Sequence, residues 1–127
     1  MNKLTDASVY SKAHHIVFGK AVTKPGIEKL VKQLIQDIGR PLSHNGIIVG
    51  HIKVLVKLPD EEFIFVSLTR LDRVDVRFST QWATDLVNEF NSINLDINVL
   101  IFGYNDAVIA EAVDASLAAL RKESTCN

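Results

Sequence analysis

The residues best suited to chemistry lie in one short stretch, the turn His44-Asn45-Gly46 followed by Gly50-His51-Ile52-Lys53. In a strand, side chains two residues apart project from the same face, so the imidazole of His51 and the ammonium of Lys53 should lie about 7 Å apart. Both groups donate hydrogen bonds and can grip one anion together. A glycine inside an apolar strand, such as Gly50, often marks a bulge or the close approach of a ligand or another backbone.

The next apolar segment ends in further polar residues that could join this patch. If the two segments form a hairpin, cross-strand neighbours share a face, and the combined side chains could hold a phosphate or a carboxylate. The predicted ligand-binding residues are therefore His44, Asn45, Gly50, His51, Lys53, Ser67, Thr69 and Arg70. The alternative is that these residues are the solvent side of an antiparallel sheet, an interpretation that requires nothing beyond half-burial.

Other kinds of site lack their residues. The adjacent histidines His14-His15 would point about a hundred degrees apart on a helix, and no ligand set for a structural zinc is present, so we expect no metal site. The single cysteine, Cys126, excludes an internal disulfide. No motif assigns a catalytic residue or a cofactor. A helix start flanked by Lys20, Lys24 and Lys29 attracts anions only generically, and solvated lysines are the simpler interpretation.

The composition is that of an ordinary globular protein. Hydrophobic residues make up 47% and charged residues 23% of the 127 residues, and the net charge is −1. A pI near 6.4 without a concentrated basic helix argues against a nucleic-acid partner. No apolar run approaches the roughly 18 residues of a membrane-spanning helix, and no secretory signal is visible. We therefore expect a cytoplasmic protein without a membrane partner.

The spacing of apolar residues predicts four helices and three or four strands. Helices are predicted from about Thr5 to Phe18, from Pro25 to Ile38, from Ser79-Thr80 to Ser92, and from Asn105-Asp106 to beyond Leu120. Strands are predicted over 48–58, 62–69 and 95–103, where alternation or β-branched content dominates. The segment from Val74 to Phe78 is either a third strand of its own or the same strand continued beyond a bulge.

These elements predict an α+β fold. The sheet is expected to be an antiparallel or mixed β-sheet of 3-4 strands with helices packed mainly on one face, in the order α-α-β-β-(β)-α-β-α. No linker or repeat divides the sequence, so residues 1–127 should form a single domain with frayed ends at about 1–4 and 123–127. The strand over 95–103 should be central and covered on both faces for part of its length.

Two features favour a non-enzymatic binding or assembly module that self-associates as a homo-oligomer. Aliphatic strands leave at least one edge to be paired, and no proline or inward charge guards Val99 to Phe102. Residues 1–60 also carry an excess of Lys and Arg, whereas residues 61–127 carry an excess of Asp and Glu. The alternative function is a small enzyme or ligand-binding domain that holds an anionic small molecule at the segment containing His44, His51 and Lys53.

Overall fold

The protein is described by a computed structural model that covers residues 6–125. Two long helices and five strands follow one another along the chain, with one short 3-10 turn between the second and third strands. In chain order they are β1 (Ala7–Thr23), α1 (Lys24–Leu42), β2 (Ile47–Lys57), η1 (Pro59–Glu61), β3 (Phe63–Arg70), β4 (Arg73–Phe78), β5 (Glu89–Phe102) and α2 (Asp106–Thr125).

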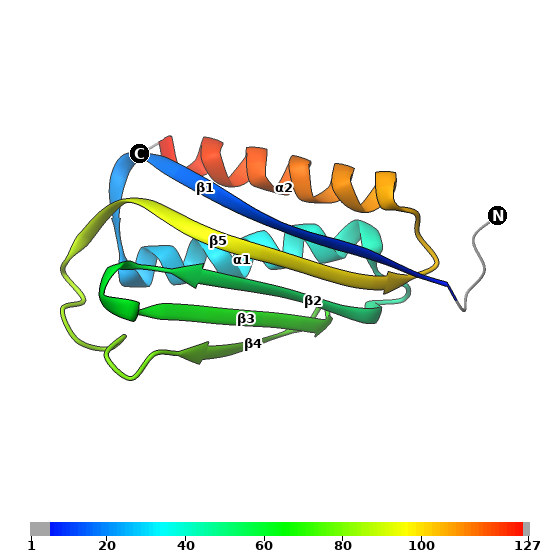
Figure 1. Ribbon diagram of the computed structural model, residues 1–127, viewed down its shortest axis with the longest axis horizontal. Coiled ribbons are helices and arrows are strands. Elements are labelled where there is room, and N and C mark those ends of the chain that lie inside the picture. Colours follow the sequence, from blue (N-terminus) through cyan, green and yellow to red (C-terminus); the bar gives the residue numbers. More distant parts are fainter. Residues whose placement is uncertain (1–5, 126–127) are drawn as a thin grey trace.

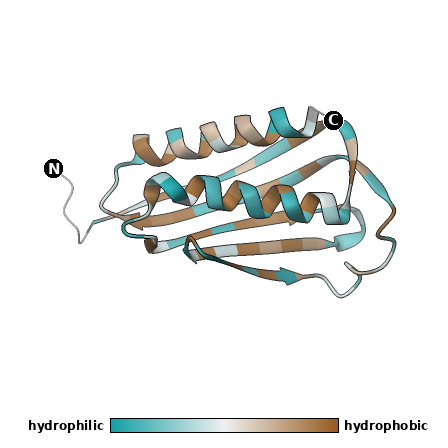
Figure 2. Cartoon of the chain, turned by 180° about the vertical axis from the view of Figure 1, so that it is seen from behind, coloured by the Kyte–Doolittle hydropathy of each residue, from teal (hydrophilic) through white to brown (hydrophobic). Residues whose placement is uncertain are grey.

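The five strands form one antiparallel sheet in the order β1-β5-β2-β3-β4. Both helices lie side by side behind this sheet in Figure 1 and in front of it in Figure 2, so they cover a single face. We call this the covered face and the other the open face. The α+β class is confirmed. The predicted sheet of three or four strands and the predicted element order are wrong, because the order is β-α-β-β-β-β-α.

The core lies between the helices and the covered face. Helix α1 contributes the apolar stripe that the sequence predicts, and Leu34 is 1% exposed. The strands contribute every second residue, as the alternation of side chains along a strand requires. Residues of this core include Ile27, Val31, Leu34, Ile35, Ile38, Ile52, Val54, Val56, Ile64, Val66, Leu95, Ile97, Val99, Val113 and Leu117.

The helix predicted from Thr5 to Phe18 is wrong, because residues 7–18 of this segment belong to the long strand β1, and Thr5 lies outside the described residues. Its apolar residues fit both a helical and a two-residue period, but Val9, Ile16, Val17 and Phe18 are the β-branched and aromatic types that favour a pleated strand. Pairing with β5 then buries Ile16 and Phe18 on the covered face and leaves Val9 and Val17 on the open face. The tertiary pairing overrides the helical spacing.

The helix predicted from Ser79-Thr80 to Ser92 is also wrong. Ser79 does not cap a helix, since its Oγ accepts a hydrogen bond from the backbone N–H of Phe63 across the β3–β4 pair. The chain then forms a loop until β5 begins at Glu89. The ammonium of buried Lys24 holds this loop: it pairs with Glu62, and it donates to the carbonyl oxygens of Gln81 and Thr84, the latter at 2.8 Å.

The remaining elements refine the prediction. The segment from 74 to 78 is a strand of its own, β4, which follows a tight turn after β3. Strand β5 lies between β1 and β2, so it is central, but helices cover only one of its faces. The edge predicted at Val99 to Phe102 is therefore wrong, because both sides of this segment are paired. The edges of the sheet are β1 and β4. Helix α2 continues through residues 123–125, while residues 1–5 and 126–127 lie outside the described part.

Candidate functional site

Lys53 lies at the middle of a row of polar side chains that crosses the open face. Its register partners are Asn98 on β5 and Ser67 on β3. The row continues to Ser11 on β1 and Asp75 on β4, so it contains one residue from each strand. The predicted proximity of Lys53 and Ser67 is therefore present in the structure, on the face that no helix covers.

Lys53 is a cation without a counter-ion in this row. Within residues 6–125 no carboxylate lies within ion-pair distance of its ammonium, whereas Lys57, two rows away on the same strand, pairs with Asp96 at 3.0 Å. Asp75 at the end of the row pairs with Arg73 instead. The centre of the open face therefore carries one uncompensated positive charge.

His51 adds an unsatisfied polar atom next to this charge. It alternates with buried Ile52, so it points to the open face as Lys53 does, and it lies opposite Leu100 of β5. Its Nδ1 is buried and has no hydrogen-bond partner among the described residues. A buried polar atom left without a partner is costly, and because Nδ1 is covered by neighbouring atoms, a ligand bonds it only after the imidazole turns outward.

Gly50 is required by the backbone of β5 rather than by a ligand. Its φ is +135°, and a Cβ at this position would lie 2.0 Å from the carbonyl oxygen of Leu100. The pairing of β2 with β3 is also irregular here, because the register passes from Ile47 opposite Arg70 to Ile52 opposite Leu68. The sequence offers a bulge, a ligand or another backbone as explanations for this glycine. The structure shows the bulge and the close approach of another backbone.

The turn His44-Asn45-Gly46 lies beside Arg70 at the end of the sheet where β2 begins, away from Lys53. His44 and Ile47 exchange backbone hydrogen bonds of 2.8 and 3.0 Å, and Asn45 and Gly46 both have positive φ, as an Asn-Gly turn requires. Ile47 lies four residues before His51, which is roughly 13 Å along a strand. Arg70 pairs with Asp72 at 3.3 Å. Thr69 is exposed within the irregular stretch of the β2–β3 pair.

The open face also carries polar side chains that were not predicted as part of the candidate site. On the open face, Ser11 donates to Asn98 Oδ1 at 2.7 Å, and His15 Nδ1 lies 2.7 Å from Asn94 Oδ1. The alternation of Asn94, Asp96 and Asn98 with buried Leu95, Ile97 and Val99 is visible in the sequence and could have found the β5 residues. Ser11 and His15 were hidden because their strand was interpreted as a helix.

Hollows on the open face gather around Lys57. One of about 520 Å³ lies between β1, β5 and β2 and is lined by polar residues that include His15, Asn94 and Asp96. A second, of about 560 Å³, lies beside Leu55 and Phe63, and Lys57 lines both. These are shallow depressions on a pleated surface, which suit a binding surface better than an enclosed reaction chamber.

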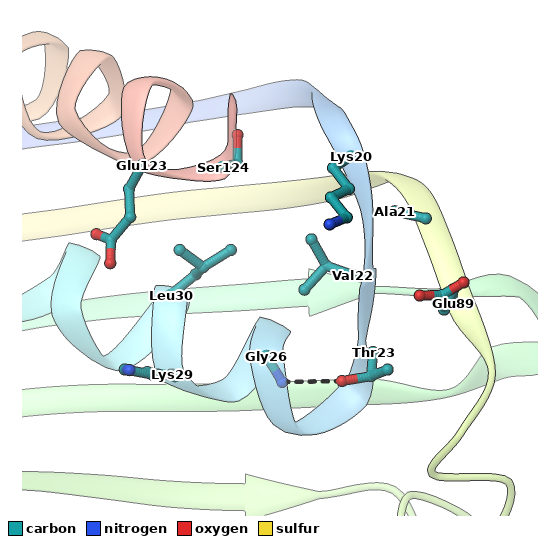
Figure 3. A pocket seen from close by; sticks show the side chains of 10 residues that line it. All are labelled: Lys20, Ala21, Val22, Thr23, Gly26, Lys29, Leu30, Glu89, Glu123 and Ser124. Carbon is teal, nitrogen blue, oxygen red and sulfur yellow. Dashed lines mark hydrogen bonds between the residues drawn. The ribbon is translucent and has the colours of Figure 1, made fainter. Parts of the chain in front are cut away.

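A separate pocket of about 300 Å³ lies where β1 meets the start of α1 and the end of α2 (Figure 3). Lys20 and Val22 point into it from β1, and Leu30 and Glu123 reach it from the helices. Its rim carries Lys29 as well as Glu89 and Glu123, so both signs of charge are present. Lys24 is not part of this lining and is fully buried, which contradicts the interpretation of all three lysines near this helix start as solvated.

Two titratable side chains on the covered face of β1 are perturbed by their surroundings. The hydroxyl of Tyr10 lies 2.9 Å from His14 Nε2, and the two rings stack. Burial lowers the pKa of His14, and the nearby charges of Lys12 and Arg121 lower it further, against the opposing effect of Asp114. Burial, with a smaller contribution from Asp114, raises the pKa of Tyr10. Both shifts favour the neutral form of the side chain.

Two further features are absent from residues 6–125. These residues contain no group of three or more His, Cys, Asp or Glu side chains arranged to hold a metal ion. Neither of the two described helices is both long and apolar enough to span a bilayer. Comparison of the chain with protein-family profiles, with curated proteins and with solved structures finds no match.

Proposed function

We propose that this chain is a binding module, non-enzymatic and cytoplasmic, that holds a small anion on the open face of its sheet. One observation carries this proposal. Among the described residues, the ammonium of Lys53 has no counter-ion and Nδ1 of His51 has no hydrogen-bond partner, and the two residues lie two positions apart on one face. Ser67 and Asn98 flank Lys53 and supply neutral hydrogen-bonding groups. Phosphate and carboxylate both match this set of donors.

The proposed site is smaller than the set predicted from the sequence. His51, Lys53 and Ser67 form its centre, and Gly50 supports it by letting β2 and β5 approach closely. His44, Asn45 and Arg70 lie toward the end of β2, so a small anion at Lys53 does not require them. Thr69, beside the bulge, is the peripheral member.

A thermal-shift titration tests the proposal. Inorganic phosphate and, separately, citrate should raise the melting temperature of the wild-type protein as the ligand concentration passes its dissociation constant. The double variant His51→Ala with Lys53→Ala should lose this shift. Its melting temperature without ligand should change little, because both side chains lie on the open face and outside the core.

The matched control is the double variant His15→Ala with Lys57→Ala. It removes the same two chemical groups from the same face, but from side chains that already have Asn94 and Asp96 as partners. It should keep the ligand-induced shift. A shift that is absent in the wild type, or that is equally large in the His51/Lys53 variant, would show that these residues are only the solvent side of the sheet.

Self-association is the second candidate function, and the exposed edge strand favours it. Strand β1 is the longest strand of the sheet, pairs with β5 on one side, and has no described strand on the other. Its open-face valines, Val9 and Val17, are 62% and 64% exposed. Unpaired edges with apolar side chains invite another strand.

Sedimentation tests this second candidate. A dimer or larger species should form at micromolar concentration in moderate salt. The opposite charges of the two parts of the chain are not needed for it, because ion pairs such as Lys24–Glu62 and Lys57–Asp96 already join those parts within one molecule. A monomer at every concentration would remove self-association and leave the anion site untouched.

A further inference from the structure

The two edges of the sheet are protected very differently. Strand β4 is six residues long and exposes the charged residues Arg73, Asp75 and Arg77. Alternating charges on a short edge are a standard protection against pairing with another chain. Strand β1 pairs with β5 without interruption from Ala7 to Val17, contains no proline there, and exposes valines. Strand addition is therefore expected at β1.

The side chains on the open face of β1 are arranged almost symmetrically about Ala13. Two residues away lie Ser11 and His15, and each is hydrogen-bonded to an asparagine of β5. Four residues away lie Val9 and Val17, which are exposed to nearly the same extent. Ala13 itself lies opposite Asp96, midway between the two asparagines. Such a pattern suits a two-fold axis, since an isologous contact places residue i against residue j twice.

We infer that two copies of this chain pair β1 to β1, antiparallel, about a two-fold axis at Ala13, and form one continuous ten-stranded sheet. This inference deepens the self-association proposed above and rests on it. The register sets Val9 against Val17 of the second copy, which buries four exposed valines per dimer. Alanine at the axis keeps the centre free of bulk and charge.

Neighbouring registers are less favourable. An axis at Lys12 would set the two Lys12 ammonium groups directly against each other, and like charges in opposed positions are destabilising. A shift by one residue of one strand would place open-face residues against covered-face residues, which a two-fold axis perpendicular to the sheet does not permit. The axis at Ala13 instead sets Lys12 against His14 on the second copy, so no two lysines are directly opposed.

Helix α2 must also be accommodated, because it packs against β1 on the covered face. Pairing of the two β1 strands brings the two copies of α2 toward each other. Between Asp114 and Arg121 the other exposed residues of α2 are Ala115, Ala118 and Ala119. Ala115 and Ala119 line a hollow against α1, so Ala118 is the small residue on the side of Asp114 and Arg121 that faces the second copy. A small side chain there lets two helices approach closely.

Cysteine cross-linking tests the register. In a Cys126→Ser background, Ala13→Cys should form a covalent dimer, because directly opposed residues have Cα atoms about 4.5–5.5 Å apart, within disulfide range. Ser11→Cys alone should not, because its two copies would lie roughly 13 Å apart along the strands. Ala13→Cys should therefore oxidise at least about tenfold faster than Ser11→Cys at equal chain concentration.

A mixing experiment tests the same register without a substitution at Ala13. Chains carrying Ser11→Cys, mixed with chains carrying His15→Cys, should yield a cross-linked heterodimer, while neither variant yields a homodimer. A dimer in sedimentation without preferential cross-linking in either arm would overturn the β1–β1 register but not self-association. A monomer would overturn both. Val17→Lys places a charge against Val9 of the second copy. Added to Ala13→Cys, it should prevent dimerisation, so that the covalent dimer no longer forms.

Discussion

The two faces of this sheet are made of the same strands and differ in what their side chains do. In β2, Ile52, Val54 and Val56 are fully buried against the helices, while His51, Lys53 and Lys57 on the intervening positions face the open side. The covered face excludes water and supports the fold. The open face carries cross-strand polar pairs and the candidate anion site. Residue parity along a strand therefore separates the core residues from those of the candidate anion site in this protein.

Lys24 is the exception on the covered side and provides the largest expected effect. Its ammonium is buried, with Glu62 and two carbonyl oxygens as partners and the ring of Trp82 at 5.8 Å. Removing one partner of a buried ion pair costs about 3–5 kcal/mol, because the other partner is left uncompensated. Lys24→Ala should therefore lower the unfolding free energy by about this amount in urea titrations.

Lys57→Ala is the matched control, since it removes an ion-paired lysine from the open face. The side chain of Lys57 is 54% exposed, compared with 1% for Lys24. Exposed ion pairs contribute about 0–1 kcal/mol, so the midpoint should hardly move. Equal effects of the two substitutions would break the comparison between the faces.

Leu34 tests the apolar part of the covered side. Its side chain is enclosed between α1 and the sheet, so Leu34→Ala should cost about 2–5 kcal/mol through lost burial and the cavity that remains. Lys32→Ala on the same helix removes a partly exposed residue paired with Glu28, and its cost should be near zero. Urea midpoints of the two variants measure the difference, and similar midpoints would contradict the helix orientation.

The smallest expected effect is a pH dependence from the covered face of β1. The folded protein holds the pKa of His14 below its value in the unfolded chain, which is about 6.5. As the pH falls through that value, the unfolded state binds a proton that the folded state resists, so stability should decrease toward acid. His14→Phe keeps a ring beside Tyr10 and should flatten the curve of unfolding free energy between about pH 7.5 and 5.5.

Tyr10 supplies the opposite sign at the alkaline end. Its raised pKa means that the unfolded chain loses the phenolic proton first, so stability should fall as the pH rises past about 10.

The acid side of the profile decides the prediction for His14. A wild-type profile that is as flat as that of His14→Phe on the acid side would show that His14 does not couple protonation to folding.

Elements with one dominant period were predictable from the sequence. Helix α1 has a strict apolar stripe, and β2 alternates buried and exposed residues over most of its length, so both elements were found. The bounds of β2 differ by one residue, whereas the predicted end of α1 at Ile38 is wrong, because the helix continues through Pro41 to Leu42. The segments that failed have mixed signals. Residues 9–18 fit two periods, and only pairing with β5 selects the strand. Trp82 is buried in a loop rather than in a helix, and Lys24, far away in the sequence, donates hydrogen bonds to the carbonyl oxygens of this loop.

The candidate site was predictable to the same extent as its strands. Lys53 and Ser67 were placed together because a hairpin brings neighbouring strands into register. The alternation in the sequence could have placed Asn98 on the polar side of its strand, but its position beside Lys53, like that of Ser11, depends on which strands flank β2 in the sheet. That order depends on contacts between distant parts of the chain. The unpaired state of His51 Nδ1 depends on burial by several strands and is invisible in one segment.

The pairing of β1 with β5 also constrains how the chain folds. Ala7 pairs with Phe102, so the first strand to be synthesised cannot pair until the last strand has been made. Helix α1 and strands β2 to β4 are joined by short connections and can assemble earlier, whereas closing the sheet at β1 carries the entropy of a long loop and slows folding. Until β5 arrives, β1 has two unpaired edges instead of one. A growing chain therefore passes through a state in which its longest strand can pair with the wrong molecule, and crowded synthesis favours exchange of β1 between neighbouring chains.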